Sequence, residues 1–287
     1  MAPPRIAITL GDPSGIGPEI AAKAAVDPRV LAICQPVLYG ATNAASFRPG
    51  VLSAEAGQAA FDAIRRAAQD AQSGVVAAIS TAPINKEALA LAGLPWRGHT
   101  DMLADLTGAS RVAMMFYAEP LRVVLATIHV PIADVPRLVT RELLKDVIEL
   151  TASALPRFGF PRPRIALAGL NPHAGEGGVI GCEDRAVLEP AVRAARDAGI
   201  DIVGPLPADT VFVRAMRGEF DAVVACYHDQ GLIPMKLVAF GQAVNVTLGL
   251  PIVRTSVDHG TAFDIAGKGI ADPESMVQAV LLAAKLA

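Results

Sequence analysis

Short apolar runs of strand length alternate along the chain with segments whose apolar residues recur at helical spacing. Most of these runs carry few polar residues, as expected of strands that are buried on both faces of a sheet. The predicted strands are 6–10, 30–39, 75–80, 112–116, 123–128, 165–168, 223–226 and 244–248, and the predicted helices include 57–72, 141–154, 184–198, 211–216 and 273–287. Strands that alternate with helices predict an α/β fold with parallel stretches of sheet.

The size and composition agree with a globular enzyme or binding protein. At ~150 residues per domain, the 287 residues make roughly two domains or one large α/β unit. Charged residues contribute 18% and aromatic residues 5% of the chain, which indicates a core of small aliphatic side chains and a buried subunit interface. A coding bias toward alanine is the alternative explanation of the same numbers.

Charge and cysteine content exclude several classes. The formal net charge of −3 offers no electrostatic footprint for nucleic acid. The three cysteines, Cys34, Cys182 and Cys226, are scattered and form no CxxC pair, which is typical of reduced thiols rather than of a disulfide framework. No signal peptide is recognised, and no uncharged run approaches the ~18–20 residues of a membrane helix. We therefore expect a soluble, cytoplasmic protein that binds neither nucleic acid nor a membrane.

A glycine-rich turn follows the first predicted strand. Residues 11–17 read GDPSGIG, and Pro18 then suits the first turn of a helix. Such a turn can bring backbone N–H groups close to an anionic ligand. The spacing matches neither the dinucleotide fingerprint GxGxxG nor the phosphate loop GxxxxGK[ST]. A ligand loop and a purely structural turn therefore both remain open.

The five histidines occupy motif-like positions. Three of them, His129, His173 and His228, follow predicted strands, where ligands gather in open α/β sheets. Because imidazole is the commonest nitrogen ligand of divalent metals, these histidines could converge on one ion. Asp209 or Asp229 could add an oxygen ligand or a hydrogen-bond acceptor. Histidines that only form loop hydrogen bonds are the alternative.

Two further groups of residues could bind a ligand. Cationic and polar side chains suit a phosphate or a carboxylate, although isolated Lys and Arg side chains are usually solvated. These residues are His99, Thr100, Lys236, Asn245 and Arg254. The stretch 258–273 is dense in Gly and small polar residues, which favours a loop that approaches a flat ligand closely. A simple entry into the last helix would also account for that stretch.

Together these motifs resemble the 4-hydroxythreonine-4-phosphate dehydrogenase family of pyridoxal phosphate biosynthesis, the PdxA family. The resemblance spans nearly the whole chain, with its motifs in the family's order. The matching motifs are GDPSGIGPE (11–19), TAPINK (81–86), GHT (98–100), NPHAGEGG (171–178), GPLPADT (204–210), YHDQG (227–231) and the block 244–272. The loop 258–273 also resembles the NAD-adenosine loop of isocitrate and isopropylmalate dehydrogenases.

The resemblance implies the architecture. We expect the two-domain isocitrate/isopropylmalate dehydrogenase-like fold, with mixed sheets, helices on both faces and an active-site cleft between the domains. The first domain would comprise residues 1–110 and 240–287 and carry the NAD loop. The second, residues 111–239, would carry the metal ligands and the dimer interface. A homodimer is implied, in which both chains contribute metal ligands to each shared active site.

The resemblance also implies the roles of individual residues. The metal ligands are His129, His173 and His228. The substrate contacts are His99, Thr100, Lys236, Asn245 and Arg254. The cofactor contacts are His259, Gly260, Thr261, Ala262 and Asp264, for NAD or NADP. The divalent ion stays open between zinc, cobalt, magnesium, nickel and iron. The general base stays open between Asp209, Lys236 and hydroxide on the metal.

The implied activity is metal-assisted, NAD-dependent oxidation and decarboxylation of 4-phosphohydroxy-L-threonine to 3-amino-2-oxopropyl phosphate. Three departures leave room for a relative with another substrate: a short stretch between Tyr39 and Val75, Asp101 in place of Glu, and Ala243 in place of Gly. Those substrates are D-erythronate or D-threonate 4-phosphate, or a cis-dihydrodiol carboxylate. A metal-dependent hydrolase and a non-catalytic phosphosugar-binding protein are the readings outside this family.

Overall fold

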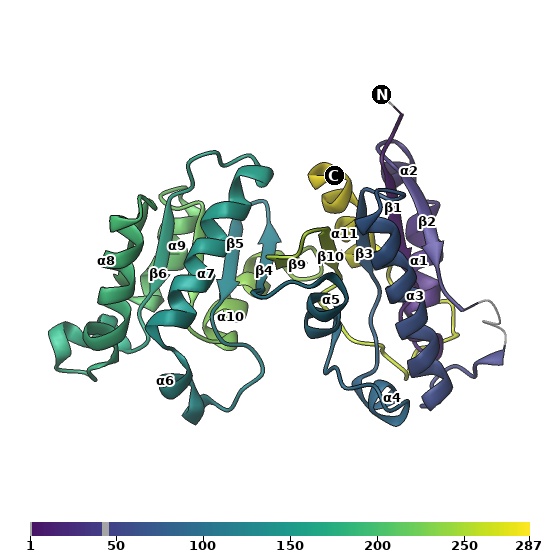
Figure 1. Cartoon of the computed structure of the whole chain (residues 1–287), viewed down its shortest axis with the longest axis horizontal. Coiled ribbons are helices and arrows are strands. Elements are labelled where there is room, and N and C mark those ends of the chain that lie inside the picture. The colour runs from purple at the N-terminus through teal and green to yellow at the C-terminus, as the bar shows by residue number, and fades with distance from the viewer. Residues whose placement is uncertain (1, 42–45) are drawn as a thin grey trace. The chain divides into compact units, whose positions relative to one another are not determined.

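The computed structural model describes residues 2–41 and 46–287. It divides into two compact units, one made of residues 1–110 and 241–287 and the other of residues 111–240. Figure 1 labels most of the helices and strands of the two units. Within the described residues, no helix has the length and apolarity to cross a bilayer. Residues 42–45, part of the short stretch between Tyr39 and Val75, lie outside the described residues.

The first unit contains a mixed sheet with the strand order β2-β1-β3-β10-β9. The pairs are parallel except for β9, which runs antiparallel to β10. The strands are β1 (Arg5–Thr9), β2 (Gln35–Tyr39), β3 (Ala78–Thr81), β9 (Val244–Leu248) and β10 (Val253–Ser256). The helices are α1 (Gly17–Ala25), α2 (Pro28–Leu31), α3 (Ala54–Gln72), α4 (Lys86–Leu91), α5 (His99–Thr107) and α11 (Glu274–Leu286).

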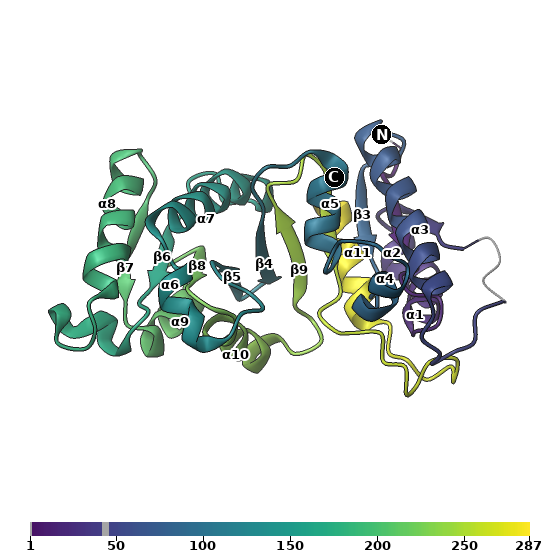
Figure 2. The same cartoon turned by 60° about the horizontal axis from the view of Figure 1, so that its bottom comes forward.

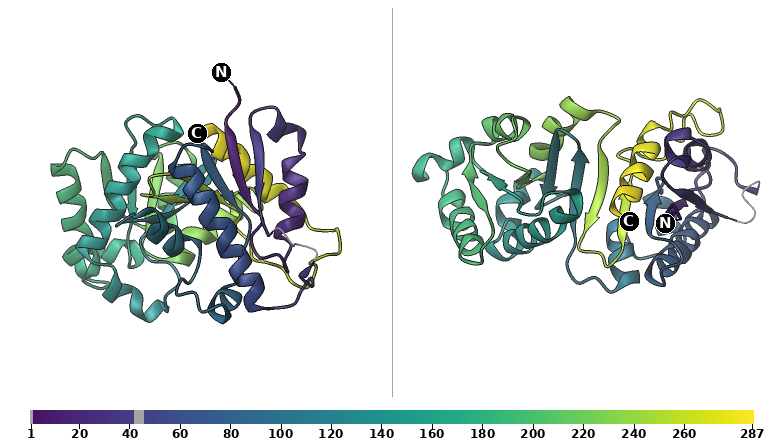
Figure 3. Two further views of the ribbon diagram at one scale, coloured as in Figure 1. Left: turned by 45° about the vertical axis from the view of Figure 1, so that its right-hand side comes forward. Right: turned by 90° about the horizontal axis from the view of Figure 1, so that it is seen from above.

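Alternate residues of these strands enter two hydrophobic clusters, one on each face of the sheet. Ile6 and Ile8 of β1 pack with α1 and α11, whereas Ala7 between them packs with α3 and α5. Successive side chains of a strand point to opposite faces, so the apolar run at the start of the chain is buried on both sides. In Figure 3 the yellow α11 and the blue α3 lie on opposite sides of these strands.

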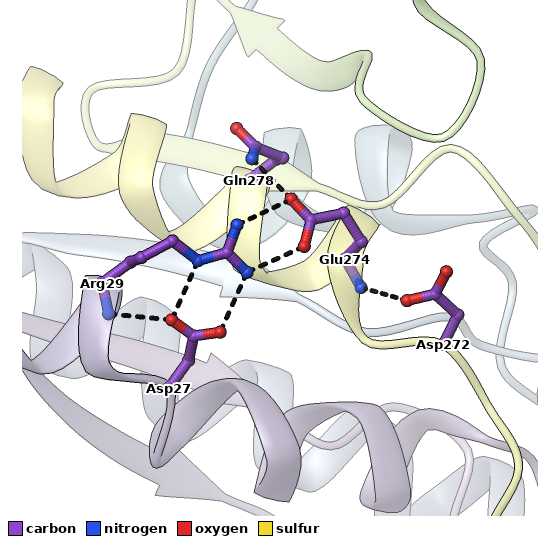
Figure 4. Close-up of polar contacts among 5 residues, drawn as sticks. All are labelled: Asp27, Arg29, Asp272, Glu274 and Gln278. Carbon is purple, nitrogen blue, oxygen red and sulfur yellow. Dashed lines mark hydrogen bonds and ion pairs between the residues drawn. The ribbon is translucent and has the colours of Figure 1, made fainter.

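A charged cluster joins α2 to α11 within the first unit (Figure 4). Asp27 caps α2 by accepting a hydrogen bond from the backbone N–H of Arg29 at 2.8 Å. The Arg29 guanidinium donates to the Asp27 carboxylate at 2.9 and 3.0 Å and to the Glu274 carboxylate at 2.8 and 3.0 Å. These hydrogen bonds from Arg29 lower the pKa of both carboxyl groups.

The second unit contains strands in the order β4-β5-β8-β6-β7, with β4 antiparallel to β5 and the other pairs parallel. Figure 2 shows α7 on one face of these strands and α9 and α10 on the other. The strands are β4 (Ala113–Ala118), β5 (Leu121–Leu125), β6 (Ile165–Ala168), β7 (Ile202–Leu206) and β8 (Ala222–Ala225). The helical segments are η2 (Ile132–Asp134), α6 (Val135–Leu138), α7 (Arg141–Ala154), η3 (Leu155–Phe158), η4 (Pro172–Gly178), η5 (Asp184–Leu188), α8 (Glu189–Asp197), α9 (Ala208–Met216) and α10 (His228–Ala239).

The expected α/β class with mixed sheets and helices on both faces is confirmed. The expectation of one strand over 30–39 is wrong at its start, because the Asp27 cap and Pro28 begin α2 there. Likewise, β7 and β10 are strands that the apolar pattern does not predict. The stretch 157–164, whose prolines and glycine are also typical of a junction between domains, lies inside the second unit.

Candidate active site

A buried arginine, Arg254, lies on β10 between β3 and β9, and no carboxylate among the described residues pairs with it. Arg254 is only 2% exposed. Its Nε and Nη2 donate to Thr81 Oγ1 at 3.2 and 2.7 Å, and its Nη1 donates to Thr247 Oγ1 at 2.9 Å. Burial lowers the pKa of Arg254 to about 9, so the guanidinium still carries its charge at neutral pH. A buried cation that only neutral groups hold is a site prepared for an anion.

His99 and Asn245 place unpartnered polar atoms in the same part of the first unit. His99 is the first residue of α5 and Asn245 lies on β9. Within the described residues, His99 Nε2 and Asn245 Oδ1 are buried and have no hydrogen-bond partner. Burial and the nearby charge of Arg254 lower the pKa of His99 well below its usual 6.5, so the imidazole is neutral at pH 7. Buried polar atoms without partners indicate that a ligand completes this site.

The structure therefore gathers part of the predicted substrate set. His99 and Arg254 lie close enough for the charge of one to influence the other, and Asn245 is on the strand paired with that of Arg254. Thr100 follows His99 on α5 and is half-buried. Lys236 belongs to the second unit, where it lies exposed on α10.

Sequence reasoning missed the two threonines that hold Arg254. Thr81 stands at the head of the TAPINK motif and Thr247 lies inside a predicted strand. Thr81 and Thr247 lie on β3 and β9, the two strands that pair with β10, which carries Arg254. The apolar pattern of the sequence does not predict β10. Without that strand, the cross-strand neighbours of Arg254 could not be derived.

The predicted cofactor loop lies against the glycine-rich turn. The Thr261 carbonyl accepts the N–H of Ile16 at 3.0 Å, and a Cβ on Gly15 would come within 2.9 Å of that carbonyl oxygen. The loop is left-handed at Ala262, with φ of 43°. His259, Gly260 and Asp264 are exposed. Gly15 thus has a structural role, because the absence of a side chain there allows the close approach of a loop whose His259 and Asp264 face solvent.

Two of the three predicted metal ligands lie side by side in the second unit. His129 follows β5, and His228 follows the neighbouring strand β8 as the first residue of α10. Their ring centroids are 5.6 Å apart. The Nδ1 atom of His228 lies 2.7 Å from Asp229 Oδ1, a contact that fixes the orientation of the ring. Since the carboxyl ends of parallel strands meet at one edge, strand order explains this pair.

Gln230 ties the ends of these strands together. Its Oε1 accepts the N–H of Cys226 at 2.7 Å, and its Nε2 donates to the carbonyl of Gly169 at 2.7 Å. Gly231 follows it, and a Cβ at that position would come within 2.7 Å of Leu125. The YHDQG motif thus packs the start of α10 tightly on the sheet and fixes the position of His228.

His173 lies on a different loop with a strained backbone. The segment η4 is left-handed from His173 (φ 53°) to Gly177 (φ 66°). Buried Asp184 holds the start of this loop, because its carboxylate accepts the N–H groups of Leu170 at 2.8 Å and Asn171 at 3.0 Å. Strain of this kind persists only where surrounding contacts enforce it. The loop is therefore built to hold the His173 position.

The three histidines do not gather into one metal site within the described part of the chain. No group of three His, Cys, Asp or Glu side chains suited to a metal ion is found among the residues described. His173 instead lines a hollow of about 520 Å³, beside Arg193 and Arg196 of α8. His129 and His228 are thus placed as two of the three predicted metal ligands, and we call this pair the half-site. Asp209, a candidate base on α9, is exposed.

Comparisons with known proteins agree with these motifs. Residues 18–283 match the family model described as pyridoxal phosphate biosynthetic protein PdxA. The 4-hydroxythreonine-4-phosphate dehydrogenase of Geobacter metallireducens is 46% identical, over 99% of this chain and 96% of its own. The D-threonate 4-phosphate dehydrogenase of Cupriavidus necator is 44% identical, over 99% of this chain and 97% of its own. The first alignment spans 324 positions, more than the 287 residues of this chain.

Solved structures give the same result for the fold. The 4-hydroxythreonine-4-phosphate dehydrogenase of Klebsiella pneumoniae has a TM-score of 0.90 and 42% identity, covering 99% of both chains. A terephthalate 1,2-cis-dihydrodiol dehydrogenase from Burkholderia xenovorans is less similar, with a TM-score of 0.72 and 32% identity over 98% of both chains. The isocitrate dehydrogenase of Methylococcus capsulatus, with a TM-score of 0.52 and 20% identity over 97% of this chain and 84% of its own, shares the fold alone. The expected isocitrate dehydrogenase-like fold class is confirmed.

Proposed function

This chain belongs to the PdxA family, and from that premise we propose that it is an NAD-dependent, metal-assisted dehydrogenase of a phosphorylated hydroxy acid. The names of its relatives support an oxidoreductase. The preferred substrate is 4-phosphohydroxy-L-threonine, which would be converted to 3-amino-2-oxopropyl phosphate for pyridoxal phosphate synthesis in the cytoplasm.

The buried guanidinium of Arg254, which among the described residues is held by threonine hydroxyls and by no carboxylate, is the observation that carries the phosphate part of this proposal. A phosphate dianion compensates the charge of Arg254 and accepts its remaining N–H groups. The neutral His99 and the amide of Asn245 add hydrogen-bonding atoms that lack partners in the described chain. Thr100 and Lys236 complete the proposed substrate contacts.

We assign the metal to His129, His173 and His228, with the third ligand from a second copy of the chain. In support, one chain brings only His129 and His228 together. The helix that begins at His228 also exposes Ile233 and Leu237, of which Leu237 is 81% exposed, and the exposed Phe240 directly follows the last residue of this helix. Residues at i and i+4 share one face of a helix, and an exposed apolar face of this kind suits burial against another chain. A second copy docked there would build a homodimer next to the half-site.

The proposed reaction needs a hydride acceptor, a Lewis acid and a base. When bound, the dinucleotide supplies the acceptor and the metal supplies Lewis acidity toward the substrate hydroxyl. The carbinol hydrogen leaves as hydride to the dinucleotide, and the hydroxyl proton passes to a base. The carboxylate β to the new ketone then leaves as carbon dioxide, the electrons of the broken C–C bond form an enolate, and a proton returns to the α-carbon to give the product ketone. Asp209 and Lys236 are the side chains proposed for the proton transfer.

The dinucleotide is assigned to the loop that carries His259, Gly260, Thr261, Ala262 and Asp264. The contact of this loop with the glycine-rich turn supports the assignment, because the turn supports its backbone while His259 and Asp264 face outward. An acidic side chain at position 264 suits ribose hydroxyls, and so favours NAD over NADP.

D-threonate 4-phosphate is the second candidate substrate, with D-erythronate 4-phosphate beside it. The relative named for D-threonate 4-phosphate is 44% identical, against 46% for one named for 4-hydroxythreonine 4-phosphate. A cis-dihydrodiol carboxylate has less support, since that relative is 32% identical. The three phosphorylated acids share the group that Arg254 is proposed to bind.

A substrate panel tests the proposal. The purified protein, loaded in turn with zinc, cobalt, nickel, iron or magnesium, is given each acid with NAD or NADP, and NADH or NADPH is followed by absorbance. Reduction of the dinucleotide with a phosphorylated acid, abolished by a chelator, is the expected result. Phosphate release without dinucleotide binding would favour a hydrolase, and ligand binding without turnover a binding protein. Either outcome would overturn the proposal.

A further inference from the structure

Arg254 keeps part of its hydrogen-bonding capacity unused. A guanidinium has five N–H groups. Three of those on Arg254 are donated to threonine hydroxyls, two to Thr81 and one to Thr247. Within the described residues, the two N–H groups left, one on each terminal nitrogen, have no protein acceptor. The tip of the side chain is therefore held from the sides while its outer donors stay available.

The register of the sheet explains why threonines hold this arginine. Arg254 of β10 pairs with Ile79 of β3, and Ser256 pairs with Thr81, so that Arg254 and Thr81 lie on the same face. Ser256 also pairs with Asn245 of β9, which puts Thr247 across from Arg254 on that face. It is the face covered by α3 and α5, where His99 begins. The two threonines thus flank Arg254 from neighbouring strands.

A threonine hydroxyl and a carboxylate differ in the charge and the hydrogen-bonding groups that they leave for a ligand of Arg254. It accepts hydrogen bonds from the guanidinium and keeps its own proton to donate. Neither Thr81 nor Thr247 donates its hydroxyl proton to another described residue. A carboxylate in either position would neutralise Arg254 and present only acceptors to a ligand. With threonines in both positions, Arg254 keeps its full positive charge and is flanked by hydroxyl groups that can donate hydrogen bonds to a ligand.

We propose that Thr81 and Thr247 are positioning residues, which orient Arg254 without compensating its charge and thereby make the site selective for phosphorylated over unphosphorylated hydroxy acids. This inference rests on the proposed function. A phosphate dianion has several lone pairs and no proton to place, so it matches a set of donors around one cation. A hydroxyl group in the same place would leave the charge of Arg254 buried and unpaired.

Substitutions of the threonines test the proposal. Thr81→Val keeps the side-chain volume and removes the acceptor of two Arg254 bonds. We expect it to weaken phosphate binding about tenfold or more, and Thr247→Val by a smaller factor, because loss of one partner strands a buried charged donor. Thr81→Ser keeps the hydroxyl and should stay within about threefold of the unmodified protein.

The matched control is Thr255→Val. Thr255 is the next residue on β10, but its hydroxyl points to the opposite face and donates to the carbonyl of Ala279 at 2.8 Å. Its removal should lower the stability of the fold while phosphate affinity stays unchanged. A loss of affinity that only reflects a loosened strand would appear in this variant as well.

Equilibrium dialysis with radiolabelled inorganic phosphate measures affinity without turnover, and kinetics on the best phosphorylated acid separate KM from kcat. We expect Thr81→Val to raise KM and Ki for phosphate with a smaller change in kcat, and Thr81→Ser to restore both. Equal phosphate affinity in Thr81→Val, Thr247→Val and the unmodified protein would overturn the inference. If Thr81→Val does not fold, the phosphate affinity of Thr247→Val, compared with that of the unmodified protein, decides the outcome. If the unmodified protein neither binds phosphate nor oxidises a phosphorylated acid, the proposed function fails instead.

Discussion

Replacement of Arg254 by methionine separates the effect of this residue on the free energy of unfolding from its effect on phosphate binding and catalysis. Methionine keeps an unbranched apolar stem in the same buried position and removes the charge. Arg254 is 2% exposed, and its partners among the described residues are hydroxyl groups alone, so in that part of the chain no carboxylate compensates the buried charge. Its removal relieves that penalty, but it leaves Thr81 and Thr247 without the donors that they accept now.

The two effects on stability oppose each other. Replacing buried charge by an apolar side chain is often worth ~1–4 kcal/mol. The loss of hydrogen-bond partners at two buried hydroxyls costs about 1–3 kcal/mol each. We therefore expect the free energy of unfolding to stay within about 2 kcal/mol of the unmodified protein. For the ligand, two charged hydrogen bonds at ~1.5–3 kcal/mol each disappear, which corresponds to a loss of roughly 10²–10⁴ in kcat/KM.

Urea unfolding with and without inorganic phosphate, and kinetics on the phosphorylated acid, check both numbers. Phosphate at 100 times its Kd should stabilise the unmodified protein by about 2.7 kcal/mol and leave Arg254→Met unchanged. A phosphate-binding role for Arg254 would be ruled out if the free energy of unfolding of Arg254→Met fell by more than about 4 kcal/mol while its kcat/KM fell less than tenfold. That pattern would make Arg254 a structural residue and not a phosphate ligand.

Three further changes test other parts of the structure. In the unmodified protein, Arg29 lowers the pKa of Asp27 and of Glu274 from their usual values of 3.8 and 4.5. The stabilisation from these two carboxylates is therefore complete above pH 4.5 and is lost as the pH falls below 3.8 through the lowered pKa values. In Arg29→Ala the melting temperature should accordingly depend less on pH in this acid range. An unchanged acid limb in Arg29→Ala would contradict this. Asp184→Asn should lower the free energy of unfolding in urea by about 2–3 kcal/mol, since an amide cannot accept the same backbone N–H groups on both atoms; a change below about 0.5 kcal/mol would be incompatible with its clamping role. Leu237→Glu should give a monomer in light scattering where the unmodified chain gives a dimer, and a monomeric unmodified chain would remove the basis of the shared site.

The apolar pattern predicts the elements whose burial is simple. Strands such as Ile165–Ala168 and Val244–Leu248, and the helix Arg141–Ala154, have the predicted bounds because each carries a continuous apolar run or an amphipathic stripe. The pattern fails at β10, where Arg254 interrupts a buried strand, and at β7, where Gly204 and Pro205 read as a turn. Strands that carry a buried functional residue, such as Arg254, or glycine and proline are therefore not predicted from apolar patterns.

The candidate site shows the same limit. The histidines and Arg254 are recognised by residue type and motif, but their partners depend on register. The contact of Thr81 with Arg254 can be predicted only when β3 and β10 are known to pair. The helix α10 is not predicted from the sequence, because Gly231 and Pro234 are unfavourable inside a helix, although the packing of α10 against the sheet accommodates both. The predicted grouping of His173 with His129 and His228 is not found among the described residues of one chain, where His129 and His228 alone of the three lie side by side.

Complementation between two inactive variants is the sharpest test of a metal-dependent dehydrogenase site built from two copies of this chain. His173→Ala and His228→Ala, each purified alone, should show no NAD reduction with the phosphorylated acid. Mixed, partly unfolded and refolded together, they should recover about a quarter of the unmodified activity, because half of the random dimers are mixed and each mixed dimer has one intact site. No recovery on mixing, or full activity in either variant alone, would contradict the account.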